Sequence, residues 1–162
     1  MMTKRAYLCL GANMGDARAS LAAARARLTE AGLVIEAASA LYRTPPWGPI
    51  PQDPYLNQVL AVITPLTART LLDLALHTER ALGRDRTREQ RYGPRPIDID
   101  ILLFEGEHHA TTELELPHPR LMERAFALVP LVEIAPDLEL AGTRVADALA
   151  RLDRSGIERL PP

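Results

Sequence analysis

The chain has 162 residues, of which 47% are hydrophobic and 25% are charged, and its formal net charge is −2 at pH 7. These values are ordinary for one globular domain with a buried core, so we expect a single domain over residues 1–162. The near-neutral charge argues against a chain that binds nucleic acid or an anionic membrane through a general positive field. Any anion-binding site must therefore come from a local cluster of charges.

Two further features indicate a protein of the cytoplasm. The first residues, "MMTKRAYLCLGANMGD", lack the long apolar stretch of a signal peptide, and no apolar run approaches the roughly 20 residues of a membrane span. The one cysteine, Cys9, excludes an internal disulfide framework, which fits a reducing compartment. We interpret Cys9 as a small buried core residue rather than a reactive thiol.

The first part of the chain alternates strand and helix patterns. Residues 5–12 form an apolar run typical of a strand, and Asp16 can cap a helix that ends at Gly32. A second strand is predicted over 33–42. A proline-rich loop, "RTPPWGPIPQDP", follows and cannot join the interior of a sheet. A third strand is predicted over 55–63.

The second part continues this alternation. Thr67 can cap a helix that ends at Gly83, and an arginine-rich loop over 84–95 leads into a fourth strand over 97–104. The rest of the chain predicts a short hairpin followed by two helices, one beginning near 120 and one near 143–152.

The order strand, helix, strand, strand, helix, strand is the βαββαβ pattern of a ferredoxin-like α+β sandwich. We expect an antiparallel sheet with an added C-terminal hairpin and helices. Since this fold has many functions, the function must be argued from particular residues.

Two aspartates stand in the fourth strand, within "RYGPRPIDIDILLF". Side chains alternate across a strand, so Asp98 and Asp100 share one face while the isoleucines between them face the other way. A half-buried strand with a solvated outer face would show the same pattern. The alternative is a site for a hard cation such as Mg²⁺, which uses one or two carboxylates and takes its remaining ligands from water and phosphate.

The loop before this strand favours the cation site. "GRDRTREQRYGPR" carries five arginines against two acids, and carboxylates beside several guanidinium groups are typical of a polyphosphate site. A solvated basic loop is the simpler interpretation. No Walker-type loop and no GxGxxG occurs, which argues against the P-loop and Rossmann modes of binding.

Other residues offer contacts of a different kind. Tyr55 and Asn57 share a strand face and present a ring and an amide to a flat heterocycle, although ordinary strand packing would also explain them. His118 lies between two prolines and could donate to a phosphate, or else be an ordinary surface histidine. Arg124 and Phe126 offer a charge and a stacking surface, or else a helix surface residue and a core residue.

The motifs "YLCLGANMGD", "YRTPPWG", "YLNQV", "GRDR", "RYGPRPIDIDILLF", "LPHPR" and "ERAFALVPLVEIAPDL" follow in this order. Together they strongly resemble the 6-hydroxymethyl-7,8-dihydropterin pyrophosphokinase family, from about residue 6 to residue 140. The resemblance implies transfer of the β,γ-pyrophosphoryl group of ATP to the hydroxymethyl oxygen of the pterin, with two Mg²⁺ ions and release of AMP. The expected substrates are these two small molecules.

The resemblance also assigns roles to residues. Asp98 and Asp100 are implied as the ligands of both Mg²⁺ ions and, with Arg84 and Arg95, as catalytic residues. The residues implied at the pterin are Thr44, Pro45, Pro46, Trp47, Tyr55, Asn57 and Phe126. The residues implied at ATP are Glu79, Arg84, Arg86, Arg91, Arg95, Ile101, His118 and Arg124. We expect the arginine-rich loop and the proline-rich loop to close over the site and exclude water.

Two other functions are open to a chain with these residues. One is a metal-dependent nuclease or other phosphodiesterase that uses the acid pair, although one compact basic loop without an extended basic face argues against nucleic acid. The other is a catalytically inactive ferredoxin-like module that binds a nucleotide or another small ligand. We expect a monomer in each case.

Overall fold

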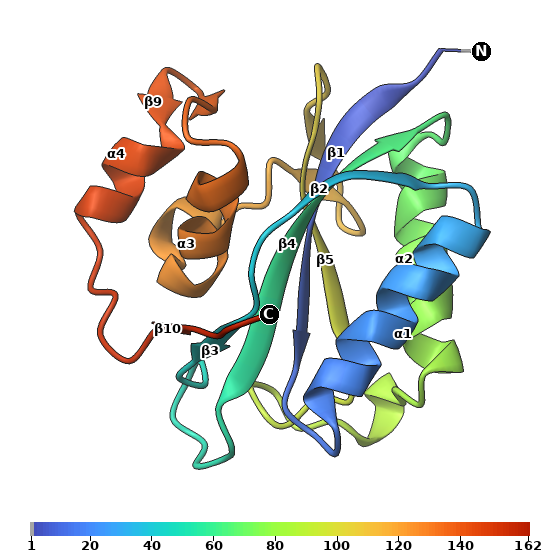
Figure 1. Cartoon of the computed structure of the whole chain (residues 1–162). Helices are drawn as coiled ribbons and strands as arrows, with labels where there is room; N and C mark the ends of the chain where they lie inside the picture. Colours follow the sequence, from blue (N-terminus) through green and yellow to red (C-terminus); the bar gives the residue numbers. More distant parts are fainter. Residues whose placement is uncertain (1) are drawn as a thin grey trace.

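The centre of the molecule is an antiparallel sheet with helices on both faces (Figure 1). The computed structural model describes residues 2–162. The strands lie in the order β10-β3-β4-β1-β5, and β2 also pairs with β4. Their bounds are β1 (Lys4–Ala12), β2 (Val34–Ala38), β3 (Tyr42–Thr44), β4 (Tyr55–Thr64), β5 (Asp98–Phe104) and β10 (Glu158–Arg159).

This order confirms the predicted ferredoxin-like sandwich. The last core strand, β5, lies beside the first, β1, which in turn lies beside β4, the partner of both β2 and β3. Every pairing among these strands is antiparallel.

The helices of the predicted core cover one face of the sheet (Figure 1). They are α1 (Ala17–Glu30) and α2 (Ala68–Ala81). Asp16 accepts a hydrogen bond from the Ala19 amide (3.0 Å), and Thr67 accepts one from the Thr70 amide (3.1 Å). Both predicted caps are therefore confirmed, because each side chain satisfies an amide that has no partner within its helix.

The opposite face of the sheet is covered by the C-terminal helices, α3 (Ala125–Ile134) and α4 (Val145–Ala150). The connecting elements are the hairpin β6 (His109–Ala110) and β7 (Glu115–Leu116), the hairpin β8 (Glu139–Leu140) and β9 (Thr143–Arg144), and the 3-10 turns η1 (Arg86–Arg88) and η2 (Leu121–Glu123). No helix in the described part of the chain is both long and apolar enough to cross a membrane.

Two predicted boundaries were wrong. The strand expected over 33–42 is split into β2 and β3, because the Ser39 hydroxyl accepts a hydrogen bond from the Val59 amide (3.0 Å) and the Ala40 amide turns to the Glu133 carboxylate. The helix expected from about 120 begins at Ala125, after the single turn of η2.

The register of the sheet places three important residues side by side. Gly11 in β1 lies opposite Asn57 in β4 and opposite Asp98 in β5. Since neighbouring strands are about 4.8 Å apart, the backbones at Asn57 and Asp98 are about 10 Å apart. We refer to Asn57, Gly11 and Asp98 as the cross-strand row.

Candidate active site

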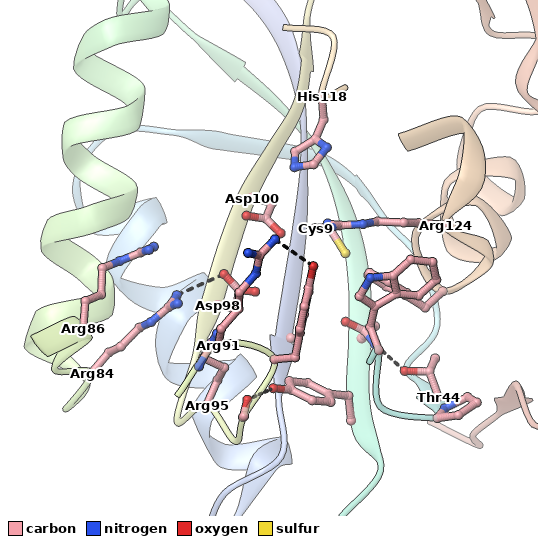
Figure 2. Close-up of a pocket in the computed structure, with 18 residues that line it drawn as sticks. Cys9, Thr44, Arg84, Arg86, Arg91, Arg95, Asp98, Asp100, His118 and Arg124 are labelled. Carbon is pink, nitrogen blue, oxygen red and sulfur yellow. Dashed lines mark hydrogen bonds and ion pairs between the residues drawn. The ribbon is translucent and has the colours of Figure 1, made fainter. Parts of the chain in front are cut away.

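A pocket of about 290 Å³ opens over the cross-strand row (Figure 2). Its walls come from β1, β3, β4 and β5, from the two loops over 45–54 and 84–95, and from the segment that leads into α3. The sequence-predicted residues that line it are Thr44, Pro45, Trp47, Tyr55, Asn57, Arg84, Arg86, Arg91, Arg95, Asp98, Asp100, His118, Arg124 and Phe126.

Three predicted site residues do not line this pocket. Pro46 lies in the proline-rich loop without reaching the wall, and Ile101 is a core residue that packs on the α1 and α2 side of the sheet. Glu79 lies near the end of α2 and is 1% exposed, so its carboxylate is buried. A contact of Pro46, Glu79 or Ile101 with a ligand stays a prediction.

The two aspartates project from β5 into the pocket (Figure 2). Asp98 keeps 32% of its side chain exposed, and Asp100 is half-buried beside the buried thiol of Cys9. Burial, together with the charge of Asp98, raises the pKa of Asp100 to about 8. A carboxyl group in this position gains from a cation that offsets the cost of ionising it.

The acid pair fits a magnesium ion better than a transition metal. Its donors are carboxylate oxygens, and the described residues contain no cluster of three or more His, Cys, Asp or Glu side chains that could enclose a metal. A cation at Asp98 and Asp100 would therefore need further oxygen ligands from water or a substrate. That is the usual coordination of Mg²⁺ at phosphate sites.

Arg84 connects α2, the arginine-rich loop and β5. Its guanidinium donates to Glu79 (2.8 Å), to Glu89 (2.7 and 3.0 Å) and to Asp98 (3.0 Å), and only 4% of its side chain is exposed. Burial opposes its charge, but the three carboxylates outweigh burial and raise the pKa of Arg84. Arg84 is thus a fixed positive charge that orients Asp98.

Glu79 is the buried acceptor that fixes Arg84 and Arg86 next to β5. One of its oxygens accepts hydrogen bonds from Arg84 and from the Ile99 amide (each 2.8 Å), and the other accepts one from Arg86 (2.8 Å). Burial raises the pKa of Glu79, whereas these donors lower it. The carboxylate therefore ties the end of α2 to β5 and to the arginine-rich loop.

Arg124 faces the acid pair from the other side of the pocket (Figure 2). Its guanidinium carbon lies 5.7 Å from the centre of the Trp47 ring and 5.6 Å from that of Phe126. Its Nε is buried and has no hydrogen-bond partner among the described residues 2–162. Because a buried donor without a partner is costly, this nitrogen is suited to an anionic ligand.

His118 offers a neutral hydrogen-bond donor. Burial, then the charge of Arg124, lowers its pKa, so the ring is uncharged at neutral pH. Its Nδ1 accepts a hydrogen bond from the Arg120 amide (3.2 Å), which places the remaining hydrogen on Nε2. Figure 2 shows the ring at the same side of the pocket as Asp100, and both side chains line the pocket.

The other end of the pocket is uncharged. Asn57 donates to the hydroxyl of Thr44 (2.6 Å), and both side chains are buried. A methyl group on Gly11 would lie 2.6 Å from Oδ1 of Asn57, so only glycine allows the amide to take this position. Trp47 and Phe126 pack edge to face nearby, with ring centres 6.1 Å apart.

A network that sequence reasoning missed holds the two loops together. Asn13 donates to Gln52 (2.8 Å) and exchanges two hydrogen bonds with the backbone of Arg95, while Gln52 donates to the carbonyl of Tyr92 (2.6 Å). Tyr55 donates to the carbonyl of Gly93 (2.9 Å). These contacts join residues about 40 to 80 positions apart, so no local pattern could have indicated them.

Cys9, Gly11, Tyr92 and Gly93 also line the pocket and were not predicted. The alternation of side chains along β1 could have placed Cys9 and Gly11 on the face of Asp98 and Asp100, had the register been known.

A family model described as 7,8-dihydro-6-hydroxymethylpterin-pyrophosphokinase (HPPK) matches residues 7–136, a range that includes the whole cross-strand row, both loops and Arg124. The chain belongs to the HPPK family.

Relatives of this HPPK chain match it over almost their whole length. A protein of Methylorubrum extorquens named 2-amino-4-hydroxy-6-hydroxymethyldihydropteridine pyrophosphokinase is 54% identical, over 96% of this chain and 98% of its own. A Pseudomonas aeruginosa protein of the same name is 41% identical over 99% of both chains. The resemblance to this family that the sequence motifs indicated is confirmed.

Solved structures share the fold of this HPPK chain. The wild-type HPPK-DHPS of Plasmodium falciparum superposes with a TM-score of 0.68 at 14% identity, over 93% of this chain and 41% of that one. A structure described as HPPK-DHPS in complex with substrates gives 0.67, over 92% and 43%. This chain thus spans less than half of those larger chains, and the likeness concerns the fold alone.

Proposed function

We propose that this chain transfers the pyrophosphoryl group of ATP to the hydroxymethyl group of 6-hydroxymethyl-7,8-dihydropterin and releases AMP and the pterin diphosphate. This is the reaction expected of an HPPK, a step of folate biosynthesis in which ATP is the co-substrate. The observation that carries the proposal is one pocket with two unlike ends. Four arginines and two aspartates line one end, an amide with aromatic rings lines the other, and Arg124 lies between the rings and the acid pair.

The uncharged end suits a pterin. Asn57, held by Thr44 and Gly11, presents a fixed amide to the edge of the heterocycle. Tyr55 and Phe126 provide ring faces on either side, and Trp47 extends the aromatic wall. A pterin bound at Asn57 would lie about two strand spacings, roughly 10 Å, from Asp98.

The charged end suits a triphosphate. Arg86, Arg91, Arg95 and Arg124 surround it with guanidinium groups, and His118 adds a neutral donor. These groups stabilise the negative charge on the oxygens of the transferred phosphate groups, because the pocket holds several donors close together. Positioning and electrostatics are sufficient for a loose phosphoryl transition state, so the reaction needs no strong general base.

We further propose that Asp98 and Asp100 hold two Mg²⁺ ions. Asp98 and Asp100 would hold the ions through their carboxylate oxygens, and the bound metal would supply positive charge against the triphosphate. Arg84 donates to Asp98 and limits which of its oxygens face the pocket. The raised pKa of Asp100 makes its ionisation dependent on nearby positive charge.

The charged and uncharged ends come from one chain, which supports a monomer as the active form. The free, buried thiol of Cys9 is compatible with work in a reducing cytoplasm. Both the monomer and the location stay proposals.

The test is an incubation of the purified protein with ATP, Mg²⁺ and 6-hydroxymethyl-7,8-dihydropterin, followed by separation of the nucleotides. We expect AMP and pterin diphosphate in equal amounts, and turnover at least about 1000-fold lower for Asp98→Ala, a loss of roughly 4 kcal/mol of transition-state stabilisation. Asp73→Ala, which removes an exposed carboxylate from α2, is the control and should keep full activity.

Other products would contradict particular parts of the proposal. ADP as the product would mean transfer of a single phosphoryl group. Binding of both ligands without turnover would indicate an inactive module. A normal rate for Asp98→Ala at saturating Mg²⁺ would overturn the metal assignment while leaving the reaction in place.

A further inference from the structure

The chain returns to the sheet near its C-terminus and pairs with β3, the strand that leads into the proline-rich loop (Figure 1). We refer to residues 155–161 as the C-terminal strap. In it, β10 pairs Glu158 with Arg43 and Arg159 with Tyr42. The Leu160 amide donates to the Leu41 carbonyl (2.8 Å), and the Leu160 side chain is 8% exposed.

Side chains add to this backbone pairing. Arg43 donates to Glu158 (2.8 Å), and Arg18 at the start of α1 donates to the Pro161 carbonyl (3.2 Å). Ile157 packs against the hydrophobic core on the α3 side of the sheet. The strap is therefore attached to the body of the molecule at both of its ends.

The strap matters for β3 because this strand has few other supports. It is three residues long, and within the part of the chain that the structure describes its only other strand partner is β4. The two residues after it are Pro45 and Pro46, which have no amide hydrogen to donate to a neighbour. The position of Thr44 and Pro45 thus depends on the strands on either side, β4 and the strap.

Gly156 brings the strap directly against the pocket wall. Its φ of +80° is a left-handed conformation that favours glycine. A methyl group added to Gly156 would lie 3.2 Å from Cγ and 3.7 Å from Cδ of Pro45, so the backbone of the strap rests on the Pro45 ring. Pro45 and Thr44 line the pocket, and Thr44 accepts the hydrogen bond that holds Asn57.

We propose that the C-terminal strap is a positioning element for the pterin end of the pocket, and that Gly156 is a positioning residue that acts through Pro45. The inference rests on the proposed function, since it takes the uncharged end as the pterin site. The hydrogen bonds and contacts described above join the strap to β3, α1, Pro45 and the core on the α3 side, and none of them reaches the arginine-rich loop or β5. Its influence should therefore fall on pterin binding and leave ATP binding unchanged.

The experiment compares Gly156→Ala with Gly142→Ala. Gly142 lies in the turn between β8 and β9 with a φ of +82°, so alanine has nearly the same backbone strain there. No atom of the described residues lies within 4 Å of the added methyl group, however. We expect the dissociation constant and KM for the pterin to rise about three- to tenfold in Gly156→Ala, because small displacements of positioned groups have large effects. Gly142→Ala should match the wild type.

Two further measurements separate positioning from general damage. Trp47 is the single tryptophan and lies in the proline-rich loop, so its emission and its quenching by acrylamide report on that loop. We expect both to change in Gly156→Ala and not in Gly142→Ala, while the melting temperatures of the two variants fall by similar amounts. Gly156→Asn should reproduce the pterin defect with less backbone strain, because asparagine tolerates a left-handed conformation.

Equal pterin constants in Gly156→Ala and Gly142→Ala, with a wild type that turns over normally, would overturn the inference and leave the proposed function intact. An equal loss of pterin and ATP binding would also overturn it. A wild type that forms no pterin diphosphate would contradict the proposed function itself.

Discussion

At the scale of single residues, Asp100 shows how a site can be unfavourable to the folded chain and useful to its ligand. The side chain is half-buried on β5 beside Asp98. Burial and this neighbour raise its pKa to about 8, whereas an aspartate in an unfolded chain has a pKa of about 3.9. Ionised Asp100 is therefore a cost to folding that a bound cation relieves.

A dependence of stability on pH follows from this difference. Between about pH 4 and about pH 8 the folded chain holds a proton on Asp100 that the unfolded chain has lost, so the free energy of unfolding falls as the pH rises. Asp100→Asn removes this effect. With EDTA present, the melting temperature of the variant relative to the wild type should increase from about pH 5 to about pH 8. A difference that stays constant across this range would contradict the raised pKa.

Residue identities in the pocket were predictable where a local pattern carried them. Asp98 and Asp100 were visible as two acids on one face of an apolar strand, and the arginines were visible as a cluster in one loop. Asn13 and Gln52 gave no such signal, because their roles come from hydrogen bonds between distant loops. Motif resemblance named Tyr55 and Asn57, but not the role of Gly11 in shaping the amide position.

At the scale of elements, the end of α2 and the start of β5 form one unit through buried charges. Glu79 accepts hydrogen bonds from the Ile99 amide and from two arginines, and its side chain is 1% exposed. Such an arrangement stabilises the fold only while every partner is present, because an unpaired charge in the interior is strongly unfavourable.

We expect Glu79→Gln to lower the free energy of unfolding by about 3 kcal/mol, near the lower end for a broken buried pair, because Arg84 retains Glu89 and Asp98. Urea unfolding followed by circular dichroism measures this change. Asp73→Asn, an exposed carboxylate on the same helix, should change stability by less than about 0.5 kcal/mol. If the two variants unfold at the same urea concentration, the buried pair does not contribute to stability as we infer.

Helices and strands could be predicted from the sequence where interactions between neighbouring residues determine where they begin and end. The caps at Asp16 and Thr67, and the extent of β4, depend on neighbouring residues and were placed correctly. The division between β2 and β3 depends on Val59 and Glu133, which are distant in sequence, and was missed. The two-residue strand β10 is too short to leave a periodic pattern.

At the scale of the whole molecule, charge is distributed very unevenly. The net charge is −2, yet five arginines and two aspartates line one pocket. The exposed acids elsewhere balance this positive cluster, so the overall charge conceals the anion site. The composition alone could exclude a general nucleic-acid surface, but it could not locate the pocket.

This distribution predicts how the two substrates respond to salt. The Debye length, over which charges attract one another in solution, shortens from about 10 Å at 0.1 M ionic strength to about 3 Å at 1 M. The attraction between partly exposed guanidinium groups and a triphosphate therefore weakens across that range. We expect the dissociation constant for ATP to rise several-fold and that for the uncharged pterin to change little. Calorimetric titrations at both salt concentrations measure the two constants. A parallel change in both would mean that the two ends of the pocket are not electrostatically distinct.

The cross-strand row sets limits on where a chain of this kind can change its length. Asn57, Gly11 and Asp98 face one another through fixed strand pairing, and side chains alternate at every residue. One residue inserted into β1 before Cys9 would turn Cys9 and Gly11 to the other face of the sheet and disturb the pairing that places Asn57 and Asp98 on either side of Gly11. Insertions and deletions that preserve activity should therefore occur in the two loops that frame the pocket, where they alter the fit of the substrates and leave the distance between the reacting groups unchanged.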